Sequence, residues 1–383
     1  MEKHIEKFWK LAIAFDGLEA DNKYDIEKYL FEKYKETKQS KLLKTYYFVK
    51  PLIPRKMQIF LRRKKARTQE VSFPHWPIEE KLEDMKRDIL KNLRKGKDKI
   101  PFIWFWPHGK NFAVVLTHDV ETSRGLSNIE TICGIEKKYG FRSSWNFVPE
   151  RYTVNTELLE GLSNDGFEIG IHGLKHDGKL FNSKQIYERR MNQIEKYASE
   201  WGAVGFRSPS THRNPDWMIN MPFEYDSSFP DTDPYEPQPG GCLSIFPFFI
   251  GNLLELPITL AQDHTLFEIL GYKDISIWKQ KIAWIEKMNG MVLLVVHPDY
   301  MFTDIRLGLY EDFLKILSQK SDFYHALPCD VANWWRRRDR SNIKFDSGGK
   351  PHIEGPLAED GIVAHAELSS NKVNLVVMGQ HLA

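Results

Sequence analysis

The chain has 383 residues, of which 42% are hydrophobic and 28% are charged. These proportions are typical of a folded globular protein with a sizeable core, and they exclude a disordered or collagen-like chain. The 54 Lys and Arg residues almost balance the 52 Asp and Glu residues, and the net charge of +2 gives no global preference for nucleic acid. The cysteines are Cys133, Cys242 and Cys329, an odd and widely spaced set that argues against a disulfide framework or a thiolate zinc site.

The N-terminal 110 residues are expected to form a helical, basic extension. Residues 1–40 have the apolar spacing of an amphipathic helix. Residues 41–67 then carry 10 basic and no acidic residues, with aromatic and aliphatic residues between them. Two interpretations stay open for this basic segment: a solvated helical face that packs its aromatics on the main domain, and a peripheral contact with anionic lipid headgroups. Nucleic acid is not expected, because no recognisable binding module accompanies the segment.

Neither a secretory signal nor a transmembrane helix is expected from the sequence. Charged residues interrupt the N-terminal segment where a signal peptide would be continuously apolar. The longest apolar stretch, residues 242–261, is broken by Pro247, Glu255 and Pro257. We therefore expect a cytoplasmic protein, with the inner membrane surface as a peripheral location if the basic segment binds lipid.

From residue 112 onwards short apolar runs alternate with helical patterns. The expected strands are residues 113–118, 142–148, 167–172, 203–207 and 291–297. The expected helices are residues 128–139, 155–165, 183–200, 275–288 and 309–319. This alternation predicts parallel β/α units, in which functional side chains gather at the carboxyl ends of the strands. Beyond the boundary at residue 334, the turns of the tail predict a small β-rich appendage.

Two of the expected strand ends carry residues suited to metal chemistry. Asp119 and Glu121 follow the first strand, and at i and i+2 of an extended chain their carboxylates face the same side. His172 ends another strand, and His176 lies four residues on. In a helical turn both imidazoles could hold one metal ion, with a carboxylate from a neighbouring strand as third ligand. Each motif alone is more often a cap, an ion pair or a chance pattern than a metal site, but their joint placement favours a metal site.

Four motifs, in this order, resemble those of the polysaccharide deacetylase family, also called NodB-homology domains or carbohydrate esterase family four. They read T-H-D-V-E at 117–121, H-G-L-K-H at 172–176, R-S-P-S-T at 207–211 and V-V-H at 295–297. The resemblance implies an α/β fold, a distorted (β/α) barrel, with a divalent metal that is usually zinc and otherwise cobalt, nickel or manganese. The expected division is a helical extension at 1–110, a catalytic barrel at 111–333 and a β-rich tail at 334–383.

The resemblance also implies the metal ligands. His172 and His176 match the two histidines of the family's second motif and would bind the metal. The second Asp of the family's first motif is Val120 here, which cannot bind a metal. A branch of the family carries D-x-E instead, so Glu121 is assigned as the third ligand. The family's Gly in the third motif is Thr211, which leaves the shape of the backbone there open.

The catalytic roles that the resemblance implies fall on four further residues. Asp119 would be the general base, and Arg207 would hold its carboxylate in place. His297 would be the general acid for the leaving group, and Asp226 sits where the family carries an acid that pairs with this histidine. Metal, base and acid together would hydrolyse an acetyl group, because the metal polarises the carbonyl while protons move to and from the side chains.

Accessory residues are less clearly assigned. His118 replaces the family's Phe and is expected to be structural on the opposite face of its strand, with an accessory role as the alternative. Asp263 and His264 follow an expected strand, where they either make surface hydrogen bonds or contact the site.

The function that these observations favour is the removal of N- or O-linked acetyl groups from a glycan, such as a cell-envelope or exopolysaccharide intermediate. An acetylated carbohydrate is thus the expected partner. One alternative is a hydrolase of small cyclic amides on the same fold. Another is an inactive carbohydrate-binding or scaffold protein, which Val120 at a ligand position would support.

Overall fold

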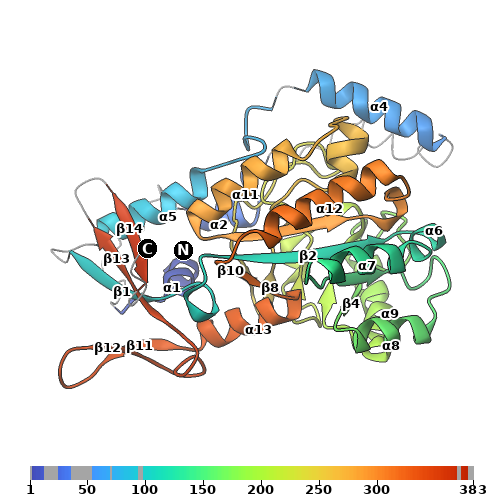
Figure 1. The fold of residues 1–383 in the computed structure, drawn as a ribbon. Helices are drawn as coiled ribbons and strands as arrows, with labels where there is room; N and C mark the ends of the chain where they lie inside the picture. The colour runs from blue at the N-terminus through green and yellow to red at the C-terminus, as the bar shows by residue number, and fades with distance from the viewer. Residues whose placement is uncertain are drawn as a thin grey trace.

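The structure is a computed structural model, and it describes residues 2–12, 25–35, 54–69, 71–93, 98–368 and 372–377. Its centre is a nine-stranded sheet with helices around it (Figure 1). The strands are β2 (Phe112–Val120), β3 (Ser144–Phe147), β4 (Glu168–Ile171), β5 (Gly205–Phe206), β6 (Tyr225–Asp226), β7 (Phe248–Ile250), β8 (Leu253–Glu255), β9 (Met291–Val296) and β10 (Phe323–His325). All five expected strands are present, so the predicted β/α alternation is confirmed.

The sheet curls into a distorted barrel. From β2 the strand order runs β2-β3-β4-β5-β6-β8, and β9 pairs with β2 on its other edge. Just beyond β8, the backbone N–H groups of Thr259 and Leu260 donate to the carbonyl of Leu293 in β9, at 3.2 and 3.1 Å. These bonds connect the two ends of the strand series. Only β7 runs antiparallel to its partner, so the remaining strands direct their carboxyl ends to one side.

Helices follow the strands as the polar and apolar spacing predicts. They are α6 (Ser123–Leu126), α7 (Ile129–Lys138), α8 (Thr156–Asn164), α9 (Lys184–Trp201), α10 (Pro215–Met218), α11 (Ser276–Met288), α12 (Asp304–Ser318) and α13 (Pro328–Asp339). Side-chain caps begin several of them: Ser183 accepts from an N–H of α9, and left-handed Gly202 ends that helix. α12 begins before residue 309 because Thr303 caps it. Short segments are η3 (Pro107–Gly109), η4 (Pro209–Thr211), η5 (His264–Ile269) and η6 (Pro298–Tyr300).

The described residues of the N-terminal extension form the helices α1 (Glu2–Trp9), α2 (Ile26–Leu30), α4 (Arg55–Thr68) and α5 (Lys81–Asn92). The expectation of one amphipathic helix over residues 1–40 is wrong, because α1 already ends at Trp9. α1 ends because Lys10 has a φ of 46° and Leu11 forms a bridge with Phe102. Residues 41–53 of the basic segment lie outside the described residues. None of the described helices combines the length and apolar character that crossing a membrane requires.

A small sheet joins the end of the N-terminal extension to the C-terminal tail. β1 (Lys99–Ile103) pairs antiparallel with β13 (Val363–Leu368), which in turn pairs with β14 (Val373–Val377). β11 (Asn342–Phe345) and β12 (Pro351–Glu354) form a separate hairpin. The described tail is therefore rich in strands from residue 342 onwards, whereas the expected boundary at residue 334 lies inside α13.

Candidate metal centre and catalytic site

Three of the residues expected to bind metal lie together. The nearest ligand atoms of Glu121, His172 and His176 are all within 4.8 Å of one another. Glu121 follows β2, and His172 follows β4, so parallel strands bring them to the same edge of the barrel. His176 reaches the cluster by a turn in which its own φ is 53°, and its Nε2 lies 3.0 Å from Oε1 of Glu121.

The chemistry of this cluster fits a divalent cation. Nδ1 of His172 donates to the carbonyl oxygen of Arg207 at 3.2 Å, so Nε2 carries the lone pair. That Nε2 is buried and has no hydrogen-bond partner among the residues that the structure describes, a costly arrangement unless a ligand completes it. Burial lowers the pKa of His172 to about 4, which keeps the imidazole neutral at physiological pH. Two imidazoles and one carboxylate are the donor set of many catalytic zinc sites.

Asp299 positions Glu121 and was not anticipated from the sequence. Its Oδ2 accepts from the backbone N–H of Glu121 at 2.8 Å, and its Oδ1 accepts from the hydroxyl of Thr122. Burial alone would raise the pKa of Glu121, but the ion pair with His176 holds this pKa well below its usual value. The sequence did offer a signal for Asp299, because this acid lies two positions after His297 and follows β9, the strand that pairs with β2.

Asp119 is held by an amide and a guanidinium. Nδ2 of Asn146 donates to Oδ1 of Asp119 at 2.9 Å, and Nη1 of Arg207 lies 3.5 Å from the same oxygen. Arg207 is fixed in turn by the hydroxyl of Thr117 at 2.8 Å and the carbonyl of Ser227 at 2.7 Å. Burial raises the pKa of Asp119, but Arg207, the neighbouring histidines and the hydrogen bond from Asn146 together outweigh burial, and the pKa ends below its usual value. Asn146 was missed, although it is a polar residue in an otherwise apolar strand pattern.

His297 pairs with Asp263, so the expected pairing with Asp226 is wrong. Nδ1 of His297 donates to Oδ1 of Asp263 at 2.6 Å, and its backbone N–H donates to Oδ2 at 3.0 Å. Burial lowers the pKa of His297, but the carboxylate of Asp263 outweighs burial and raises the pKa to about 10. Asp226 instead accepts from the hydroxyl of Ser228 at 2.7 Å. Asp263 reaches His297 because the segment that precedes it pairs with β9, whereas Asp226 ends β6.

The remaining accessory residues, His118 and His264, lie in different parts of the fold. His118 points away from the cluster: its Nε2 lies 2.7 Å from Oε1 of Glu136 and its ring stacks on Trp145 at 4.2 Å. Its expected structural position on the opposite face is therefore confirmed. His264 lies on the acid side of the site, with its ring 6.3 Å from that of His297 and 5.1 Å from that of Tyr300.

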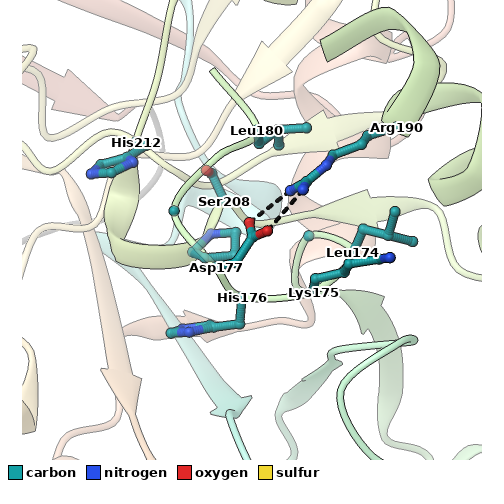
Figure 2. A pocket seen from close by; sticks show the side chains of 11 residues that line it. Leu174, Lys175, His176, Asp177, Leu180, Arg190, Ser208 and His212 are labelled. Atoms are coloured by element: carbon teal, nitrogen blue, oxygen red, sulfur yellow. Dashed lines mark hydrogen bonds and ion pairs between the residues drawn. The ribbon is translucent and has the colours of Figure 1, made fainter. Parts of the chain in front are cut away.

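A pocket open to solvent adjoins the cluster on the side of His176 (Figure 2). Its empty volume, which includes space open to solvent, is about 250 Å³. One wall is fixed by Arg190, which makes two parallel hydrogen bonds to Asp177 at 2.7 and 2.8 Å. Ser208 and His212 line it as well, and the buried hydroxyl of Ser208 has no hydrogen-bond partner in the structure. A polar group of a substrate could therefore be recognised beside the cluster.

No protein-family model and no curated protein matches the chain, but solved structures do. A protein described as a polysaccharide deacetylase from Mycobacterium smegmatis is 18% identical, with a TM-score of 0.50 over 61% of this chain and 93% of that chain. Another so described, from Pseudomonas aeruginosa, is 15% identical, with a TM-score of 0.49 over 61% and 93%. An allantoinase is 13% identical, with a TM-score of 0.49 over 61% and 92%.

These comparisons define the class of fold. The chain has the (β/α) barrel-type fold of the polysaccharide deacetylases, as the sequence motifs imply, with additional N- and C-terminal parts. The M. smegmatis structure aligns over nearly its whole length, so the fold extends across that chain rather than a fragment of it. The resemblance drawn from the four motifs is thereby confirmed at the level of the fold.

Proposed function

We propose that the protein is a metal-dependent hydrolase that removes N- or O-linked acetyl groups from a glycan, such as a cell-envelope or exopolysaccharide intermediate. The observation that carries this proposal is the cluster of Glu121, His172 and His176, which lies next to two proton-transfer groups. Asp119 lies beside His172, with Oδ2 3.8 Å from Nδ1. His297, the second of these groups, is hydrogen-bonded to the carboxylate of Asp263.

A divalent cation held by this cluster, zinc in our proposal, would polarise an acetyl carbonyl and lower the pKa of water to about 7. The chain itself supplies the proton transfers. Asp119 is ionised because Arg207 lies beside it, so its carboxylate can accept a proton from the attacking water. His297 is kept protonated by Asp263, so Nε2 can donate a proton to the leaving nitrogen or oxygen.

The metal assignment is tested by metal stoichiometry. Wild-type protein, Glu121→Ala and Glu150→Ala are loaded with zinc, exchanged exhaustively into buffer and measured by plasma mass spectrometry. Glu150 is the matched control, because its carboxylate pairs with Lys175 at 3.1 Å and is not part of the cluster. We expect one tightly bound zinc in the wild type and the control, and loss of it in Glu121→Ala. A wild-type protein that retains no metal would contradict the proposal.

The reaction is tested by acetate release from a panel of acetylated oligosaccharides. Asp119→Asn should lower turnover by about 10²-fold or more, because a general base is removed. Turnover of small cyclic amides with none of glycans would instead support the amide-hydrolase alternative. Glycan binding that is equal in wild type and Asp119→Asn, with no turnover in either, would support an inactive binding protein.

A further inference from the structure

The helix α4 turns three large apolar residues away from the protein. Met57, Phe60 and Leu61 are 51%, 59% and 39% exposed. They lie at positions i, i+3 and i+4, which share one face of a helix, and exposed Lys64 continues that face one turn later. A surface helix of a globular protein normally directs such a stripe toward the core. The interpretation in which the apolar residues of this segment pack on the main domain therefore fails for these residues of α4.

The opposite, polar face attaches α4 to the barrel. Nε of Arg63 donates to the carbonyl of Glu268 at 2.5 Å, and Nη2 of Arg62 donates to the carbonyl of Tyr235 at 3.0 Å. Just past the helix, Nε2 of Gln69 donates to the carbonyl of Pro234 at 3.1 Å. These bonds orient the helix, so the exposure of the apolar stripe follows from which residues bind the protein.

α4 is attached to the segment that follows Asp263, the partner of His297. In Figure 1 it lies along the upper edge of the molecule, above α12. The segment to which it is attached is η5, which begins directly after Asp263. Glu268 of η5 also accepts from Nη2 of Arg306 in α12, at 2.6 Å. Two more apolar residues are exposed at the beginning of α12, Phe302 at 37% and Ile305 at 74%.

The charge of this surface indicates its partner. α4 contains no acidic residue, and Lys64, Lys65 and Arg67 are exposed. Among the described residues, no ion pair neutralises these three. We propose that the outer face of α4, together with Phe302 and Ile305, docks on an anionic lipid bilayer and thereby turns the η5 side of the candidate site toward the membrane. Apolar side chains enter the boundary between headgroups and acyl chains, while basic side chains attract the anionic headgroups.

Vesicle co-sedimentation of the full chain tests this docking surface without reference to turnover. The probes are vesicles of phosphatidylcholine alone and of phosphatidylcholine mixed with phosphatidylglycerol, at low and high salt. The variants are Phe60→Asp, Ile305→Asp and the charge reversal of Lys64 and Lys65 to Glu. Phe345→Asp is the matched control, because Phe345 is 51% exposed on the β11–β12 hairpin and outside the proposed surface. Single substitutions are preferred to deletion of the N-terminal segment, because Phe8 and Trp9 of that segment are buried in the core and a deletion would disturb the fold.

We expect the wild type and Phe345→Asp to bind the anionic vesicles in a salt-sensitive manner. Phe60→Asp and Ile305→Asp should each weaken binding by about tenfold or more. The charge reversal should weaken it by about thirtyfold or more. The proposal is overturned if the wild type does not bind anionic vesicles, or if Phe60→Asp binds as the wild type does. Unchanged binding of Ile305→Asp would overturn the orientation of the site toward the bilayer. Salt-sensitive binding to DNA without binding to vesicles would assign the surface to nucleic acid instead.

Discussion

At the scale of single residues, the proton-donating histidine depends on one carboxylate. Asp263 holds both Nδ1 and the backbone N–H of His297 and raises the pKa of that imidazole to about 10. The charged form therefore persists through neutral and mildly alkaline pH. In Asp263→Asn the negative charge is lost, and the pKa of His297 should fall toward 6.5. The alkaline limb of the kcat profile then moves to lower pH, and kcat at alkaline pH falls by about 10²-fold.

Measurement of kcat against pH for wild type, Asp263→Asn and Asp226→Asn checks this prediction. Asp226 is the informative control, because it bonds Ser228 rather than His297. Its variant should keep the alkaline limb of the wild type. An alkaline limb that shifts in Asp226→Asn and not in Asp263→Asn would contradict the assignment of the pair.

The amide of Asn146 makes a second residue-scale prediction. Its Nδ2 donates to Asp119 at 2.9 Å and favours the ionised carboxylate. Asn146→Ala should raise the pKa of Asp119, so the acid limb of the kcat/KM profile moves to higher pH. Loss of orientation should also lower kcat by about tenfold. A merely structural role would lower thermal stability without moving the acid limb, so profiles and melting temperatures are measured together.

At the scale of elements, the turn from β2 into α6 is built around Asp299. Gly125 of α6 is buried against this carboxylate, and a Cβ atom at position 125 would clash with its Oδ2. Because Asp299 also accepts from the N–H of Glu121, displacing it disturbs a proposed metal ligand. We expect Gly125→Ala to lower the free energy of unfolding by about 1–3 kcal/mol and to weaken zinc binding.

Gly134 supplies the matched control for this substitution. It is exposed in α7, and a Cβ atom there would meet nothing within 4 Å. Gly134→Ala should raise the free energy of unfolding by about 0.5–1 kcal/mol and leave zinc binding unchanged. Stability is measured by urea denaturation and zinc affinity by titration for both variants. Equal effects of the two substitutions would contradict the proposal that the turn around Asp299 positions Glu121.

At the scale of the whole molecule, one buried arginine connects the N-terminal segment to α13, the helix that follows the last strand of the barrel sheet. The guanidinium of Arg338 in α13 donates to the carbonyls of Lys7 and Trp9, at 3.1 and 3.4 Å, in α1. It also donates to the carbonyls of Ile103 and Trp104, at 2.7 and 3.1 Å. Lysine has no planar guanidinium group, and its single ammonium would leave several of these buried carbonyl acceptors unpaired.

Arg338→Lys should therefore reduce the free energy of unfolding by about 3 kcal/mol or more. Arg337→Lys, at the adjacent position, should reduce it by less than about 1 kcal/mol, because Arg337 pairs with Asp360 near the surface. Urea denaturation of the two variants provides the measurement. If both lose the same stability, then Arg338 does not connect the N-terminal segment to α13.

Local sequence carried the information for the barrel and for part of the site. The strand β2 is an uninterrupted apolar run until Thr117, as expected of a strand buried on both faces of a parallel sheet. The spacing of Asp119 from Glu121, and of His172 from His176, is a short-range property, so the sequence could place these side chains at strand ends. Their convergence followed because parallel strands end on one side of the sheet.

Contacts between distant segments were decided by the tertiary structure alone. The partner of His297 depends on which loop lies beside β9, and local spacing near Asp226 or Asp263 carries no record of that choice. The outward face of α4 likewise depends on Arg62 and Arg63 reaching carbonyls far along the chain. The amino-acid sequence by itself thus determined which segments form strands and which site residues follow them, through hydrophobic periodicity and motif spacing. Pairings across the fold required the three-dimensional structure, because they arise from packing between elements that no local pattern encodes.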